Sequence, residues 1–423
     1  MTFTLTNTRI IDPEAGTETL GAVRIENGVI AEILQLETDG IDCGGKYLAP
    51  GIIDIGVKIG EPGERHKESF RTAGLAAAAG GVTTMVTRPD TTPAIDTPEI
   101  LDFFRRRAED ICPVNVLPMA ALTKGREGRE MTEIGFLLDA GAVAFSDADR
   151  PVENAKTLLR VLTYAGAMDA LVMGHVQEPV MSKGAAVTSG PMATKLGLPG
   201  VSPMAERIQL ERDLALVEMS GARFHADQIT CAAALPVLER AKAAGLRVTA
   251  GVSIHHLTLN EMDIEGYRTF FKVKPPLRAE DDRLAVVQAV ADGLIDIISS
   301  MHTPQDEESK RLPFEEAASG AVALQTLLPA AMQLVHAGHM DLPTLFRAIS
   351  LNPAKLLGLE SGRMEVGAPA DLILFDADAP FVMDRFKLLS KSKNTPFDGR
   401  RMQGKVLRTF VAGKQVFGDD NAT

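Results

Sequence analysis

The sequence has little cysteine, and none of it is clustered. Cys43, Cys112 and Cys231 are scattered through 423 residues without a Cys-x-x-Cys pair. Paired or densely spaced cysteines mark the disulfide framework of a small secreted domain or the ligands of a zinc ribbon. The sequence therefore implies neither kind of site.

Basic tracts and long apolar runs are also missing. The chain has 44 basic and 56 acidic residues, a formal net charge of −12, and no Lys/Arg-rich stretch. Nucleic-acid-binding proteins carry a concentrated positive footprint, and a membrane-spanning helix needs about 20 apolar residues. We therefore expect neither nucleic acid nor membrane as a partner. Because residues 1–7 also lack the features of a signal peptide, a cytoplasmic location is expected.

Short strands separated by turns are predicted at both ends of the chain. Asn27-Gly28 is a strong hairpin signal, because both residues tolerate positive φ. Chain termini often lie close together, so the two β-rich ends can pair into one small domain comprising residues 1–50 and 364–423. Its predicted strands are Thr2–Thr6, Gly21–Glu26, Val29–Gln35, Lys46–Ala49, Ala370–Asp376, Lys405–Val411 and Lys414–Phe417.

Between these ends, over residues 51–363, strand and helix patterns alternate eight times. Repeated β-α units with apolar strands indicate a parallel sheet covered by helices, and eight units indicate a closed (β/α)8 TIM-type barrel. The predicted strands are Ile52–Val57, Val82–Thr87, Val114–Ala120, Ala142–Ser146, Leu171–Gly174, Arg223–Ala226, Arg247–Val252 and Ile295–Ser299. The predicted helices are Glu68–Ala79, Pro98–Glu109, Met131–Asp139, Val152–Ala167, Met204–Ser220, Ala232–Ala244, Asp281–Asp292 and Phe314–Val335.

A doubly wound sheet is the alternative architecture. It would place a Gly-x-Gly-x-x-Gly turn after an early strand, and the sequence has none. A barrel instead places its chemistry at the C-terminal ends of its strands. At the first strand, alternation predicts that Asp54, Gly56 and Lys58 share one face and that Ile55 lies with Val57 and Ile59 on the other. The centre of the polar face is thus a glycine.

Motifs along nearly the whole chain resemble those of the class I dihydroorotases of the amidohydrolase superfamily. The resemblance implies an α/β fold in which a (β/α)8 barrel carries a small β-sandwich domain from both termini. The motifs are Pro50–Asp54, Glu61-Pro62-Gly63, His66-Lys67-Glu68, Gly80–Thr84, Lys124-Gly125, Gly141–Asp147, Leu196–Gly200, His255-His256-Leu257, Pro275–Arg278, Pro313–Glu316, Asn352–Ala354 and Ser390–Phe397.

The resemblance implies zinc chemistry, because zinc polarises a carbonyl and activates a bound water. The family ligands are a His-x-His after strand 1, an acid after strand 4, a histidine after each of strands 5 and 6, and an aspartate after strand 8. That aspartate is also the general acid/base. Glycine and alanine have no donor atom, and a thioether is a poor zinc ligand, so we expect no metal. The matching positions are Gly56, Lys58, Ala148, His175, Gln228 and Met301, of which only His175 keeps a ligand.

The substrate-binding positions implied by the resemblance are altered as well. In the family, an arginine two residues after the His-x-His grips the substrate carboxylate as a bidentate fork, and Gly60 stands there. Substrate-binding asparagines correspond to Asp90 and Lys274, and a histidine after strand 8 corresponds to Gln305. With these changes, no intact catalytic, substrate or metal residue set is expected.

We therefore expect a non-catalytic dihydroorotase-like subunit in pyrimidine biosynthesis. The resemblance implies that such a subunit assembles with the catalytic subunit of aspartate carbamoyltransferase, and a homo-oligomer is expected. The alternative is an active dihydroorotase or other cyclic amidohydrolase with a remodelled or metal-independent site, using His175, Asp147, Lys58 or His302. Met301 counts against an ordinary dihydroorotase, since it replaces the acid/base as well as a ligand.

Two further expectations concern the site and its cover. The Lys58 ammonium is expected to fill the metal space and to pair with Asp147. The loop Gln177–Pro203 is longer than a usual connection and is expected to cover the cleft or to contact a partner.

Overall fold

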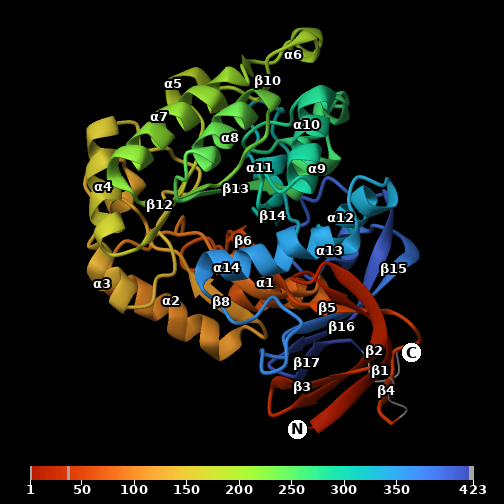
Figure 1. The fold of residues 1–423 in the computed structure, drawn as a ribbon. Helices are drawn as coiled ribbons and strands as arrows, with labels where there is room; N and C mark the ends of the chain where they lie inside the picture. The colour runs from red at the N-terminus through yellow and green to blue at the C-terminus, as the bar shows by residue number, and fades with distance from the viewer. Residues whose placement is uncertain (1, 36–38, 419–423) are drawn as a thin grey trace.

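The computed structural model describes residues 2–35 and 39–418, and it shows a barrel beside a β-rich domain (Figure 1). Both ends of the chain lie in the β-rich domain, at the bottom and lower right of Figure 1. Within the two described ranges, no helix is long and apolar enough to cross a membrane.

The β-rich domain is a single sheet drawn from both ends of the chain. Its order is β17-β16-β15-β5-β1-β2-β3, with β4 paired to β1. The two ends meet where β15 runs antiparallel to β5, with Ile373 opposite Ala49. Positive φ at Asn27 and Gly28 confirms the predicted turn. The strands are β1 (Thr2–Asp12), β2 (Thr17–Glu26), β3 (Val29–Leu34), β4 (Ile41–Asp42), β5 (Tyr47–Pro50), β15 (Leu372–Val382), β16 (Arg401–Val411) and β17 (Lys414–Phe417).

The barrel strands run parallel in two groups. The first is β6 (Ile52–Val57), β7 (Val82–Thr87) and β8 (Asn115–Pro118); the second is β9 (Leu171–Gly174), β12 (Arg223–Ala226), β13 (Val248–Ser253) and β14 (Ile297–Ser299). Phe145 joins the groups through parallel bridges to Ala120 and Val172. The backbone N–H of Lys58 donates to the carbonyl of His302 at 2.8 Å, which links the ends of β6 and β14.

Helices connect these strands and cover the barrel. The main ones are α1 (Phe70–Ala79), α2 (Pro98–Ile111), α3 (Ile134–Asp139), α4 (Ala155–Ala167), α7 (Met204–Ser220), α8 (Leu235–Ala243), α10 (Glu280–Ala291), α12 (Leu327–His336), α13 (Leu342–Phe346) and α14 (Asn352–Leu357). The α/β fold class predicted from the sequence is therefore confirmed. The residue boundaries proposed for the two domains stay a prediction.

The structure differs from the prediction in several segments. Residues Ala142–Ser146 form only bridges around Phe145 rather than a regular strand. The last predicted helix, Phe314–Val335, begins only at Leu327 in the structure, as α12. The loop Gln177–Pro203 contains short elements of its own, namely α5 (Pro179–Ser182), β10 (Val187–Thr188), α6 (Pro191–Leu196) and β11 (Gly200–Val201).

The predicted two-residue alternation fails at Gly56. Its φ is +102°, and the pairing with β7 shifts register between Ile55 and Val57. Ile55 packs with barrel-strand residues such as Met173 and Ile297, whereas Val57 joins the core under the helices. An irregularity of one residue turns the side chains beyond it to the opposite face. Ile55 and Val57 therefore do not share a face.

Candidate functional site

The space beside Gly56 at the end of β6 is filled by Met301. A Cβ at position 56 would lie 2.5 Å from the Met301 Sδ. Met301 follows β14 with a positive φ of 47° and is 8% exposed. Of these two positions, which bind metal in the family, position 56 therefore has no side chain and position 301 has an apolar side chain that packs against Gly56.

Lys58 faces carboxylates of the adjoining loops. Its Nζ lies 3.0 Å from Glu64 Oε2 and 3.4 Å from Asp90 Oδ2, and the side chain is 14% exposed. The expected pair with Asp147 is wrong, because Asp147 accepts hydrogen bonds from the backbone N–H groups of Leu122 and Thr123 at 3.0 Å. Asp147 therefore fixes the loop after β8 instead of facing the barrel mouth.

Arg88 and Asp90 form a buried bidentate pair after β7. Arg88 Nε donates to Asp90 Oδ1 at 3.1 Å, and Nη2 donates to Oδ2 at 2.6 Å. Burial opposes ionisation, but the charges of Arg88 and Lys58 hold the pKa of Asp90 well below its usual range. Two cations therefore surround one carboxylate at the barrel mouth. Sequence reasoning missed Arg88, although its place directly after a predicted strand was the signal.

Asp227, after β12, is a buried carboxyl group with an altered proton affinity. Burial raises its pKa to about 6, while the charge of Arg88 acts in the opposite direction. The side chain is 9% exposed. Its neighbour Gln228 donates from Nε2 to the Lys274 carbonyl at 3.2 Å. Gln228 therefore supports the loop before Pro275, and Asp227 is the titratable group at this strand end.

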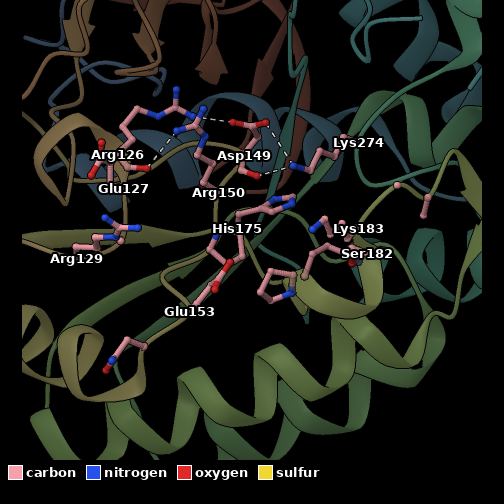
Figure 2. A pocket seen from close by; sticks show the side chains of 17 residues that line it. Arg126, Glu127, Arg129, Asp149, Arg150, Glu153, His175, Ser182, Lys183 and Lys274 are labelled. Carbon is pink, nitrogen blue, oxygen red and sulfur yellow. Dashed lines mark hydrogen bonds and ion pairs between the residues drawn. The ribbon is translucent and has the colours of Figure 1, made fainter. Parts of the chain in front are cut away.

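His175, at the end of β9, lies on the wall of a cavity of about 850 Å³. Figure 2 shows its ring near Asp149 and Lys274. Burial and the charge of Lys274 lower the pKa of His175 to about 3, so the imidazole is neutral at physiological pH. Five cationic side chains also line this space, which we call the basic cavity: Arg126, Arg129, Arg150, Lys183 and Lys274.

Asp149 anchors one side of the basic cavity. Its Oδ1 lies 2.7 Å from Arg126 Nη2 and its Oδ2 lies 3.4 Å from Lys274 Nζ, as the dashed lines in Figure 2 show. Burial opposes its ionisation, yet the charges of Lys274 and Arg88 lower the pKa of Asp149 to about 2. The preceding residue, Ala148, is buried with a positive φ of 55°. The acid at this strand end is therefore fully ionised and already paired.

The remaining substrate-binding positions hold the loops together. A Cβ at Gly60 would clash with the carbonyl oxygen of Glu64, so the turn leaves no room for a longer side chain there. Gln305 donates from Nε2 to the Ser319 carbonyl at 2.8 Å. Gly60 has no side chain, and the Gln305 Oε1, which has no partner among the described residues, is an acceptor that cannot donate to an anionic substrate.

Another histidine at a strand end serves the framework. His302 accepts at Nδ1 from the backbone N–H of Ala323 at 3.1 Å, and its Nε2 lies 3.4 Å from Glu68 Oε2. Glu68 also accepts from Ser390 and from the backbone N–H of Lys391. This fully buried pair joins the end of β14 to loops from distant parts of the chain. The motifs around residues 68 and 390 therefore contact each other through Glu68.

The strand-end residues do not fit the zinc that the family uses. His175 Nε2 is a buried nitrogen without a hydrogen-bond partner, and could serve as one ligand. Across residues 2–35 and 39–418, however, no group of three His, Cys, Asp or Glu side chains is placed to hold a metal ion. The ammonium of Lys58 and the guanidinium of Arg88 lie in the same region and repel a cation.

Known proteins match nearly the whole chain. A dihydroorotase of Ehrlichia canis (strain Jake) is 37% identical, with 97% of this chain and 94% of that protein covered. A dihydroorotase of Bacillus caldolyticus is 38% identical, with 93% and 94% covered. The model of the Dihydro-orotase-like family matches residues 45–233, and that of the Amidohydrolase family matches residues 318–417. The chain belongs to the dihydroorotase family.

Solved structures share the fold of this chain. L-hydantoinase (dihydropyrimidinase) from Arthrobacter aurescens aligns with a TM-score of 0.89, covering 99% of this chain and 97% of that one, at 24% identity. A D-hydantoinase aligns with a TM-score of 0.87, covering 100% and 96%, at 22% identity. This likeness concerns the barrel and its β-rich domain.

The comparisons correct the expectation of a non-catalytic subunit. The relatives that match from end to end at 36–38% identity carry the name of an active enzyme, dihydroorotase. The loss of zinc ligands does not by itself imply a loss of catalysis. The remodelled strand ends therefore have to be considered as a site with different chemistry.

Proposed function

We propose that the protein is a cyclic amidohydrolase that opens the ring of dihydroorotate or a similar cyclic amide at the mouth of its barrel. The names and full-length identity of its relatives support the substrate class. The observation that carries the proposal is a buried carboxyl group, Asp227, whose pKa is raised to about 6 close to the charge of Arg88. It combines a base suited to neutral pH with a cationic environment.

Asp227, Lys58 and Arg88 have separate roles in the proposed reaction. Asp227 accepts a proton from the attacking water as the new C–O bond forms at the ring carbonyl. Lys58 and Arg88, which flank Asp90, stabilise the negative charge that develops on the carbonyl oxygen. The ring C–N bond then breaks, and Asp227 returns its proton to the leaving nitrogen. The immediate products are a carboxylic acid and a free ureido nitrogen, and the acid then releases its proton to solvent and becomes a carboxylate, so atoms and charge balance.

The test is a turnover assay in both directions, ring opening of dihydroorotate and ring closure of the ureido diacid. The protein should be dialysed against a chelator first, because the proposed steps need no bound metal. We expect turnover that falls by a factor of about 10² to 10⁴ in Asp227→Asn and returns in part in Asp227→Glu. Absence of turnover in both directions with the unmodified protein would refute the proposal.

Assembly with aspartate carbamoyltransferase stays a prediction from the resemblance, as do a homo-oligomeric state and a cytoplasmic location. Size-exclusion chromatography of the mixed proteins tests the first. We expect the two proteins to elute together in a larger species than either alone. Separate elution at micromolar concentration would contradict it.

A further inference from the structure

We propose that a groove between the barrel and the β-rich domain binds an acidic, amphipathic segment of a partner protein. The groove lies where α1 and α12 meet β15, β16 and β17, and its volume is about 380 Å³. Ala79, in its wall, ends α1 shortly before β7 begins. The groove therefore lies toward the N-terminal ends of the barrel strands, and the inference does not rest on the proposed function at the opposite ends.

Apolar side chains line this groove and continue past its rim. Phe381, Leu388 and Val406 are among the residues of its walls. At the rim, Val382 is 60% exposed, and Leu389, which follows Leu388, is 40% exposed. Continuous exposed apolar surface marks an interaction site, and a pocket that takes an apolar side chain is typical of the centre of a protein interface. A peptide segment would cover both the groove and its rim, whereas a small molecule would leave the rim uncovered.

Two lysines determine the charge of the groove. Lys387 and Lys405 line it and are exposed, and within the described residues neither side chain forms an ion pair or a hydrogen bond. Asp384, the acidic residue among the described ones that line the groove, accepts from the backbone N–H of Phe386 at 3.0 Å and caps η6 (Arg385–Lys387). The whole chain has a net charge of −12, so this groove is a local exception that complements carboxylates beside an apolar side chain.

The same features count against three other occupants. A second copy, related by a twofold axis through the groove, would bring Lys387 and Lys405 against the same lysines, and like charges repel. A lipid surface is flat and offers no side chain to fill a recessed groove. The last residues of this chain, Asp419-Asp420-Asn421-Ala422-Thr423, are acidic but include no large apolar side chain. An acidic segment with an apolar centre fits both the charge and the walls.

Fluorescence anisotropy with labelled hexapeptides tests the groove at neutral pH. The peptide EELFEE has two apolar residues between carboxylates, EESSEE lacks the apolar residues, and KKLFKK reverses the charge. We expect the unmodified protein to bind EELFEE, and to bind each of the other two at least about tenfold more weakly. The affinity for EELFEE should fall as salt rises from about 50 mM to about 500 mM, because exposed charges are screened.

Variants of the groove locate the binding. The double variant Lys387→Glu with Lys405→Glu should bind EELFEE about tenfold more weakly, since each attraction becomes a repulsion. The matched control, Lys156→Glu with Arg160→Glu, makes the same change of charge on the exposed face of α4, across the barrel from β15 to β17 (Figure 1), and should bind like the unmodified protein.

A second pair of variants tests the apolar rim. Val382→Ser should weaken the binding of EELFEE by a factor of a few, because it removes apolar area that the peptide covers. The matched control is Val180→Ser on α5, where the valine is also exposed, and it should leave the affinity unchanged.

Several results would overturn the inference. Absence of EELFEE binding, binding unchanged in the double lysine variant, or equal binding of EESSEE would refute a site for an acidic amphipathic segment. Vesicles of phosphatidylserine and phosphatidylcholine that bind the unmodified protein but not the double variant would assign the groove to a lipid surface. A dimer in sedimentation velocity that the double variant dissociates would assign it to a second copy. Binding of EELFEE only after removal of residues 419–423 would assign it to the end of this chain.

Discussion

Replacing Asp227 by asparagine removes an ionisable group from the barrel mouth while keeping the shape of the side chain. The pKa of this carboxyl group is raised from 3.8 to about 6, so the folded state holds the proton more tightly than the unfolded state. Its contribution to stability is therefore present at low pH and is lost as the pH rises from about 4 through 6. At 1.36 kcal/mol for each tenfold change in proton affinity, the ionised carboxylate costs about 3 kcal/mol at pH 8.

We expect Asp227→Asn to raise the free energy of unfolding by about 3 kcal/mol at pH 8 and by about 1.6 kcal/mol at pH 5. Urea unfolding followed by circular dichroism at pH 5, 6, 7 and 8 measures this difference. Asp54, whose pKa burial also raises to about 6, is present in both proteins, and its effect cancels. Glu218→Gln on an exposed part of α7 is the matched control for the change from a carboxyl group to an amide.

The same variant should lose turnover, so it would be more stable and less active. A gain in stability that does not depend on pH, or a loss at pH 8, would refute the raised pKa. Full activity in the stabilised variant would refute the role of Asp227 as the base while leaving the electrostatic argument intact.

Three other measurements follow from the structure. Arg278→Ala removes the cationic partner of the buried Glu206, which lies at 3.1 Å, so urea unfolding should show that the free energy of unfolding falls by about 3–5 kcal/mol. The exposed control Arg207→Ala should lower it by less than about 1 kcal/mol. Equal losses in the two variants would contradict this expectation. Gly60→Ala places a methyl group against the Glu64 carbonyl and should cost about 1–3 kcal/mol in the same assay, whereas Gly266→Ala, which has open space, should be nearly neutral. Dialysis against a chelator should leave the melting temperature unchanged, because the strand ends offer no zinc ligand set; a fall of several degrees would show a structural metal.

Much of the fold was predictable, because regular periodicity and local turn signals determine it. The limits of β6, β7, β9, β12 and α7 agree with the predictions. The predictions failed where the backbone is irregular. Residues around Phe145 make bridges without a regular strand, and the positive φ of Gly56 breaks an alternation that a strict period of two cannot represent.

The candidate site was less predictable, because it depends on which side chains meet across loops. Strand-end residues such as Lys58 and Asp227 could be found from sequence order alone. Their partners could not, since Lys58 pairs with Glu64 and Asp90, whereas Asp147 accepts from the backbone N–H of Leu122. The basic cavity draws on loops from residue 126 to residue 274. No local sequence pattern predicts that these loops line the same cavity.

A protein that has lost its zinc ligands has not necessarily lost its catalytic function. Counting ligands decides whether zinc can bind, and here Met301 packs against Gly56 where ligand side chains would stand. A carbonyl is polarised by positive charge held in a dry site, and zinc is one source of that charge. Lys58 and Arg88 around Asp90 are another, fixed by ion pairs of 3.4 Å and 2.6 Å. Whether the barrel mouth catalyses hydrolysis therefore depends on Asp227, the buried carboxyl group there that titrates near pH 6, and not on the number of histidines that remain.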